Sequence, residues 1–143
     1  MTKVLFEIER DGMAGVTVEA VWARRVESGY VIDNIPFYVK SFACNDIVHA
    51  EPGPDGMLIA RSLVKASGHS TIRLWVENKD DVPIIIEKLR EMGCESEVDL
   101  GRLIAVDIPP DIPYETVQVY LDEEEKNGTF EYEEGCLGQT ANE

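Results

Sequence analysis

The stretch TIRLWVENKDDVPIIIEKLREMG (Thr71–Gly93) decides the fold, because the hydrophobic period changes inside it. Residues 71–77 alternate between two faces with period two, which predicts a β-strand. From residue 80 the apolar positions recur every three or four residues, which predicts a helix. Pro83 fits only in a first helical turn and Gly93 can end a helix, so both ends of this element are marked. The predicted buried face of the helix consists of Val82, Ile85, Ile86 and Leu89.

The same alternation of elements continues to the end of the chain. Two strands are predicted at 94–101 and 102–109, a second helix at 111–128 with Pro113 in its first turn, and a last strand at 129–137. The order strand, helix, strand, strand, helix, strand is that of a ferredoxin-like sandwich. The buried face of the second helix is predicted to contain Tyr114, Val117 and Leu121.

Before Ser67 the sequence contains strand patterns only. Residues 3–66 form five or six short alternating segments separated by turn residues, and so few residues are expected to curl into a small barrel. The predicted fold class is therefore α+β, with a small N-terminal β-barrel followed by a ferredoxin-like βαββαβ sandwich. The predicted domains are a barrel-like unit at 1–66, a sandwich at 67–138 and a disordered tail at 139–143.

The charge of the chain narrows the choice of partners. The 143 residues include 13 Lys and Arg against 28 Asp and Glu, for a net charge of -15. A field of this sign repels phosphate backbones, so we expect no nucleic-acid binding. Residues 122–134 hold seven acids and one lysine. This segment is either a solvated face or a docking surface for a basic protein partner.

Other features of the sequence bear on compartment and cofactors. No run approaches the ~20 apolar residues of a membrane-spanning helix, and the start of the chain is interrupted by charges, so no membrane association is expected. Three widely spaced cysteines suit free thiols in a reducing cytoplasm. No short-spaced ligand pair for zinc and no phosphate-binding loop occurs, so we predict neither a metal nor a cofactor.

The predicted topology brings the middle of the chain next to its end. The last strand of such a sandwich runs antiparallel beside the first, which places His69 and Ser70 near Gly135 and Cys136. Thr71, Arg73 and Trp75 are expected on the face of the sheet that the helices leave open. Glu133 is expected across the ladder from Arg73, as an exposed ion pair of small energetic effect.

Three stretches, DNIPFY (33–38), SGHSTIR (67–73) and YEEGCLG (132–138), resemble an uncharacterised bacterial family known only as a domain of unknown function. The resemblance implies a cytoplasmic bacterial protein in which these stretches belong together. It implies no reaction, ligand or catalytic residue.

Two classes of function remain. The first is a non-catalytic binding or regulatory protein that holds a basic protein partner or a small ligand at the junction of barrel and sandwich. The alternative is a small thiol-dependent enzyme in which Cys136 is the nucleophile and His69 the base. The predicted binding residues are Asp33, Asn34, Phe37, Tyr38, His69, Ser70, Arg73, Trp75, Glu133 and Glu134.

Overall fold

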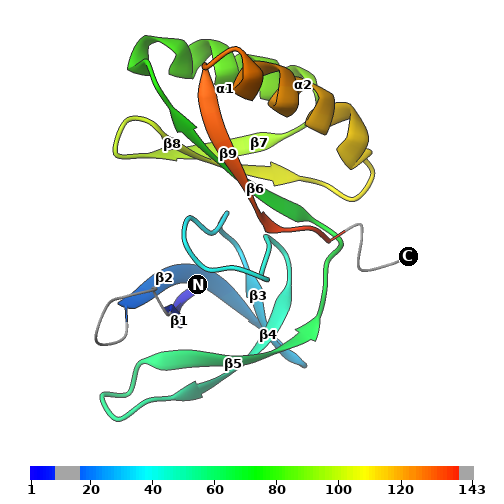
Figure 1. The fold of residues 1–143 in the computed structure, drawn as a ribbon. Coiled ribbons are helices and arrows are strands. Elements are labelled where there is room, and N and C mark those ends of the chain that lie inside the picture. Colours follow the sequence, from blue (N-terminus) through cyan, green and yellow to red (C-terminus); the bar gives the residue numbers. More distant parts are fainter. Residues whose placement is uncertain (9–16, 139–143) are drawn as a thin grey trace.

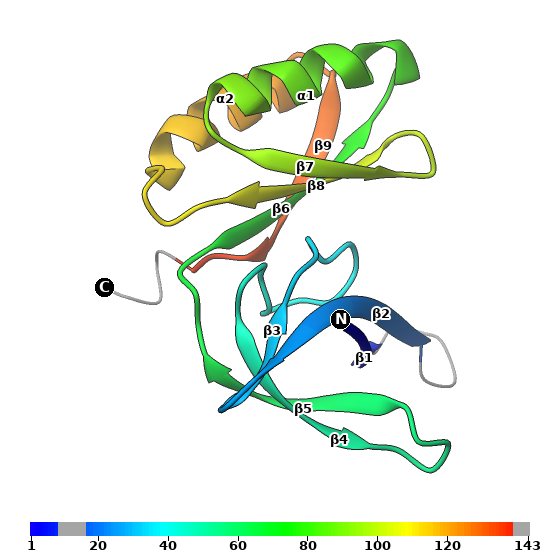
Figure 2. The same ribbon diagram turned by 180° about the vertical axis from the view of Figure 1, so that it is seen from behind.

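The computed structural model describes residues 1–8 and 17–138 and divides into two stacked halves (Figure 1). A five-stranded sheet forms one half, and a four-stranded sheet covered by two helices forms the other. The view from behind shows that the helices lie only on the far side of the second sheet, away from the first half (Figure 2). The tail predicted at 139–143 lies outside the described residues.

The first half contains strands that pair in chain order. They are β1 (Thr2–Ile8), β2 (Thr17–Val26), β3 (Gly29–Ile32), β4 (Ile47–Pro52) and β5 (Leu58–Lys65). β1 also pairs in parallel with β5, so this sheet closes on itself. Alternation along the strands sends one set of side chains inward. The interior contains Val4, Phe6, Val21, Ala23, Ile32 and Val48.

The second half is an antiparallel sheet with helices on one face. Its strands are β6 (Ser70–Val76), β7 (Glu95–Asp99), β8 (Leu103–Ile108) and β9 (Phe130–Cys136), in the order β7-β8-β6-β9. The helices α1 (Val82–Glu91) and α2 (Tyr114–Lys126) cover it. The core between helices and sheet includes Ile72, Leu74, Val76, Ile85, Leu89, Val117 and Leu121.

Both predicted helices are present, but each is shorter than predicted, and Pro113 lies before the second helix rather than in its first turn. Pro83 lies in the first turn of α1, and Gly93 follows its end with φ of +91°. A 3-10 turn (Lys79–Asp81) precedes α1, and the Asn78 side chain caps this turn by accepting from the Asp80 amide. Pro113 directly precedes the first residue of α2.

The predicted fold class is wrong. Strands hold 46% of the described residues and helices only 20%, so the chain is mostly β rather than α+β. The physical reason is that, within residues 1–8 and 17–138, two segments carry the periodicity of an α-helix, while nine short segments form strands. The structure is therefore described by its two sheets and two helices, with the strand pairing given above, and not as a ferredoxin-like sandwich.

The connection between β3 and β4, residues 33–46, positions the candidate site. It leaves the first sheet and lies against the face of the second sheet that carries no helices (Figure 1). Two of its non-glycine residues, Ser41 and Asn45, have positive φ values of 71° and 69°. Such conformations persist only where surrounding contacts fix them.

Within residues 1–8 and 17–138, no helix has the length and apolar character needed to cross a membrane.

Candidate binding site at the junction of the two sheets

The start of β6 and the end of β9 are neighbours, as the sequence predicts. Thr71 is opposite Cys136, and the Gly138 amide donates to the Ser70 hydroxyl oxygen at 3.1 Å. Further along the same ladder, Arg73 is opposite Glu133 and Trp75 is opposite Glu131. The open face of this sheet therefore carries alternate residues of both strands, because Ile72 and Leu74 pack against the helices.

Arg73 joins the two halves of the molecule. Its guanidinium donates through Nη2 to the Val39 carbonyl of the 33–46 connection and through Nη1 to Glu133 at 3.3 Å. Arg73 is only 3% exposed, so the expectation of an exposed ion pair is wrong on the arginine side. The cause is the 33–46 connection, which covers it. Gly135 leaves the space for the guanidinium, because a Cβ there would lie 2.8 Å from Nη1.

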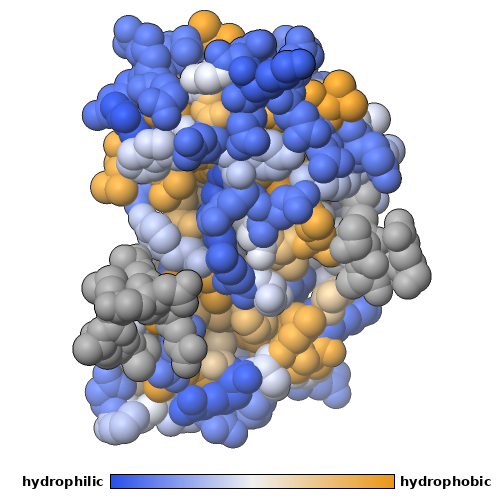
Figure 3. Space-filling view, in the orientation of Figure 1, coloured by the Kyte–Doolittle hydropathy of each residue, from blue (hydrophilic) through white to orange (hydrophobic). Residues whose placement is uncertain are grey.

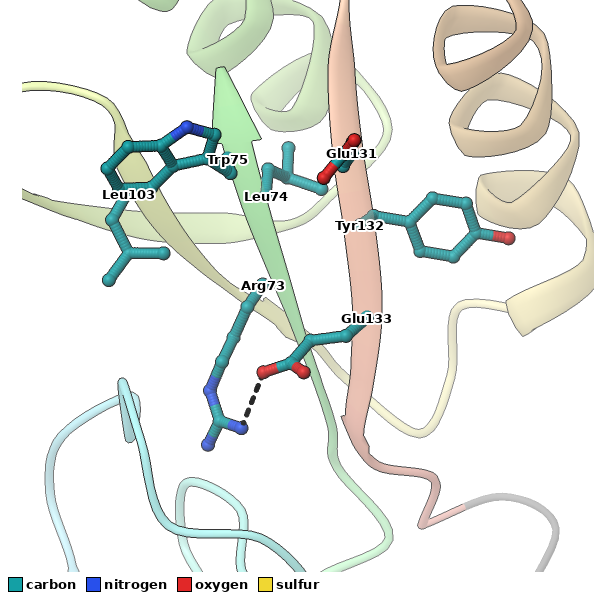
Figure 4. A pocket seen from close by; sticks show the side chains of 7 residues that line it. All are labelled: Arg73, Leu74, Trp75, Leu103, Glu131, Tyr132 and Glu133. Atoms are coloured by element: carbon teal, nitrogen blue, oxygen red, sulfur yellow. Dashed lines mark hydrogen bonds and ion pairs between the residues drawn. The ribbon is translucent and has the colours of Figure 1, made fainter. Parts of the chain in front are cut away.

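A pocket of about 240 Å³ opens beside this contact (Figure 4). Trp75 and Leu103 lie on one side of it, and Glu131 and Glu133 extend from β9 on the other. Arg73 reaches from β6 toward the 33–46 connection. Leu74 and Tyr132 contribute to the lining, although their side chains belong to the helical layer.

The indole of Trp75 is an exposed aromatic surface in this pocket. Its side chain is 41% exposed, and the guanidinium carbon of Arg102 lies 5.5 Å from the ring centroid. An aromatic face beside carboxylates favours cations, because both the ring quadrupole and the acids attract positive charge. The arrangement can bind a basic side chain or an organic cation.

His69 lies in the same junction, but its ring nitrogens already have neighbours. Nδ1 lies 2.9 Å from Oδ1 of Asp107, and Nε2 lies 3.3 Å from the side-chain amide nitrogen of Asn45. Burial raises the pKa of the Asp107 carboxyl, and its contact with His69 opposes this shift. His69 therefore links β8 to the 33–46 connection.

The Ser67 hydroxyl makes a second contact between the SGHSTIR stretch and the 33–46 connection. It donates to Asp46 or to the Cys44 carbonyl, each at 2.8 Å, and it accepts from the His69 amide at 3.1 Å. Asp46 is buried and also accepts from the amides of Ser67 and Ala43. The SGHSTIR stretch is thus held by hydrogen bonds to the 33–46 connection on its N-terminal side.

The thiols of the chain show no sign of activation. Burial raises the pKa of Cys44 to about 12 and that of Cys94 to about 11. Burial also raises the pKa of Cys136, and Asp46 adds to this while Arg73 opposes it. A nucleophilic cysteine needs a lowered pKa, so these environments argue against thiol chemistry.

The 33–46 connection is held to β2 by a carboxylate. The backbone amides of Phe37, Tyr38 and Val39 all donate to Glu19, at 2.7 to 3.0 Å. Three consecutive amides around one carboxylate form an anion-binding nest that a side chain of this chain fills. The same part of the connection also contacts β7, since the Tyr38 hydroxyl lies 3.3 Å from Asp99.

The other predicted residues of this connection lie on the side of the junction that belongs to the first sheet. The Asn34 side chain accepts from the Trp22 amide, and the Asp33 amide donates to the Trp22 carbonyl at 2.8 Å. Asn34 and Phe37 line a second cavity of about 190 Å³, together with Trp22 and Glu97. These residues are therefore brought near the second sheet but not into the Trp75 pocket.

Glu134, one of the predicted binding residues, faces away from the Trp75 pocket. Glu134 accepts a hydrogen bond from the Tyr114 hydroxyl of α2, so it belongs to the helical side of the sheet. Glu131 lines the pocket instead; it was not among the predicted binding residues, although period-two alternation from Glu133 indicates the same open face. Leu103 and Asp107 were missed because their placement depends on the register of β8, which no local signal fixes.

In the described part of the chain, residues 1–8 and 17–138, no three His, Cys, Asp or Glu side chains converge as a metal site would require.

The fold and the junction define an acidic, mostly β protein with a small cation-compatible pocket beside the contact of its two sheets. A family model described as "Domain of unknown function (DUF4265)" matches residues 19–132, so the chain belongs to this family. The match includes the DNIPFY and SGHSTIR stretches and ends at the first residue of YEEGCLG.

The solved structures contain a close architectural relative. The chain is similar to one described as "Novel crystal structure of a hypothetical protein from Neisseria gonorrhoeae", with a TM-score of 0.81 and 25% sequence identity. The alignment covers 96% of this chain and 95% of that one, so both halves of the molecule are shared. No curated protein matches the sequence.

Proposed function

We propose that this protein is a non-catalytic binding protein that holds a basic segment of a partner protein in the Trp75 pocket. The single observation that carries the proposal is the exposed indole of Trp75 between Leu103 and the carboxylates of Glu131 and Glu133. Aromatic anchors in small pockets dominate the energetics of most interfaces, and nearby acids select positively charged partners.

The charge of the chain supports a basic partner. A net charge of -15 attracts cations over the whole surface, and the attraction weakens with salt. Figure 3 shows hydrophilic residues over most of the visible face, with apolar residues exposed in small separate groups. A surface of this kind suits a reversible contact with a charged segment better than a large permanent apolar interface.

Fluorescence anisotropy with labelled nine-residue peptides tests the proposal. Peptides with three Arg or Lys residues should bind, while their Asp and Glu counterparts should not. The dissociation constant should rise between 50 and 300 mM salt, because the attraction is partly electrostatic. Trp75→Ala should weaken binding at least tenfold, as removal of a buried aromatic anchor does.

Two matched variants separate the pocket from general charge. Trp22→Ala removes the other exposed tryptophan, which lies under Lys3 on the first sheet, and should leave binding unchanged. Glu131→Gln should weaken binding, whereas Glu115→Gln on α2 should change it little. The proposal fails if no basic peptide binds, or if the control variants weaken binding as much as the pocket variants do.

The predicted thiol enzyme is not proposed. The expected base, His69, has one ring nitrogen beside Asp107 and the other beside Asn45. Burial raises the pKa of the expected nucleophile, Cys136.

A further inference from the structure

The cation that the chain itself places on Trp75 is an arginine. Arg102 directly precedes β8, and its backbone carbonyl accepts from the Val76 amide at 3.0 Å, which fixes its position beside the end of β6. Its guanidinium carbon is 5.5 Å from the centroid of the Trp75 ring. The indole therefore has a resident guanidinium before any partner arrives.

Glu131 gives this pocket an uncompensated charge. It is directly opposite Trp75 across the β6–β9 ladder. Its neighbour Glu133 is already paired with Arg73. Among residues 1–8 and 17–138, no Lys, Arg or His lies within ion-pair distance of Glu131. A second cation entering the pocket thus meets a free carboxylate beside an aromatic face.

We propose, building on the proposed function, that the Trp75 pocket selects an arginine side chain of the partner and that Arg102 is its resident competitor. A guanidinium is planar and weakly hydrated, so it stacks on an indole and still donates to a carboxylate. The ammonium group of lysine is a strongly hydrated point charge and loses more on entering. The guanidinium of the partner's arginine side chain stacks on Trp75 and donates to Glu131, and the aliphatic part of that side chain packs against Leu103.

Arg102 lowers the apparent affinity of this pocket because it must leave the indole first. An exposed cation–π contact changes a binding constant by about two- to fivefold. Arg102→Gln removes the competitor, so this variant should bind an arginine peptide about two- to fivefold more tightly than the wild-type protein. Lys126→Gln removes one positive charge from the far end of α2 and should leave the affinity within about 1.5-fold of the wild-type value.

NMR titration of the two indole N–H signals tests the inference with the full chain. The probes are acetyl-Gly-Gly-Arg-Gly-Gly-amide and the same peptide with Lys or citrulline at the central position. Citrulline has nearly the shape of arginine without its charge. The Trp75 signal should shift with the Arg peptide at lower concentration than with the Lys peptide, and the citrulline peptide should shift neither indole. The Trp22 signal is the internal control for non-specific binding.

The outcomes separate the inference from the function on which it rests. Binding of Arg and Lys peptides with equal affinity overturns the selectivity, while the proposed function stands. Unchanged or weaker binding in Arg102→Gln overturns the competitor role, since Arg102 would then be a bystander or part of the binding surface. Absence of binding by both the Arg and Lys peptides and by the longer basic peptides overturns both proposals.

Discussion

Gly135 and Arg73 form a pair whose coupling tests how the junction is built. A Cβ at position 135 would lie 2.8 Å from Nη1 and 2.9 Å from Cζ of Arg73. The guanidinium has little freedom to move aside, because it donates to the Val39 carbonyl and to Glu133. We expect Gly135→Ala to lower the free energy of unfolding by about 1–3 kcal/mol, the usual cost of overpacking.

Removal of the guanidinium should relieve this cost. Arg73→Ala alone should lower the free energy of unfolding by roughly 2–4 kcal/mol, since a hydrogen bond from a charged donor contributes about 1.5–3 kcal/mol and a cavity is left. Glu133 adds little, because its side chain is 54% exposed. In the Arg73→Ala background, Gly135→Ala should cost about 0.5 kcal/mol or less. The double-mutant cycle should therefore give a coupling energy of about 0.5–3 kcal/mol.

Urea unfolding followed by far-UV circular dichroism measures the four proteins of the cycle. Gly128→Ala is the matched control, because Gly128 has φ of +82° beyond the end of α2 and its added Cβ meets no atom within 4 Å. Its cost, about 1–2 kcal/mol from backbone strain, should be equal in both backgrounds. Equal costs of Gly135→Ala in both backgrounds would refute the steric coupling between Gly135 and the Arg73 guanidinium.

Three further substitutions or treatments probe the same junction. Burial and nearby carboxylates raise the pKa of Cys44 from 9.0 to about 12, which implies about a thousandfold less thiolate at pH 8. Iodoacetamide should therefore leave Cys44 unmodified in mass spectra under conditions in which the reagent alkylates a free cysteine peptide. Because burial raises the pKa of Asp107, the fold favours its protonated form, and stability falls as the pH rises through that raised pKa. The stability advantage of the wild-type protein over Asp107→Asn should therefore be larger at pH 4 than at pH 7 in urea titrations, and the opposite order would show that the ion pair with His69 dominates. Glu19→Gln should lower the free energy of unfolding by about 1–3 kcal/mol, because a neutral amide oxygen replaces the carboxylate that three backbone amides share. The control Glu115→Gln should change the free energy of unfolding by no more than about 0.5 kcal/mol.

The second half of the molecule was predictable because local signals agree there. Pro83 and Gly93 mark the ends of α1, and apolar spacing identifies the buried face of each helix. The expected pairing of the first and last strands placed Ser70 near Cys136, and in the structure the adjacent Thr71 is opposite Cys136. The helix inferences need only residues that are close in the sequence, whereas the pairing of the first and last strands came from the expected order of elements.

The parts that failed depend on contacts between distant segments. Arg73 was expected to be exposed, yet its burial is decided by the 33–46 connection, which has no periodic pattern of its own. The sequence also does not decide the exposure of Trp22, which is 46%, because β2 is apolar on both faces and its pattern does not choose between them. Glu134 was grouped with Glu133 although neighbouring strand residues point to opposite faces.

The 33–46 connection also explains why a pocket exists where it does. Arg73 and Trp75 are two positions apart on one face of β6, yet the first is buried and the second is 41% exposed. The 33–46 connection therefore covers the sheet as far as Arg73 but not as far as Trp75, and the guanidinium of Arg73 forms the inner wall of the Trp75 pocket. Because Glu19 and Arg73 hold the connection from opposite sides, the shape of this wall is set when the junction folds. A pocket formed in this way is ordered before a partner binds, so less conformational entropy is lost on binding than at a surface that must first be organised.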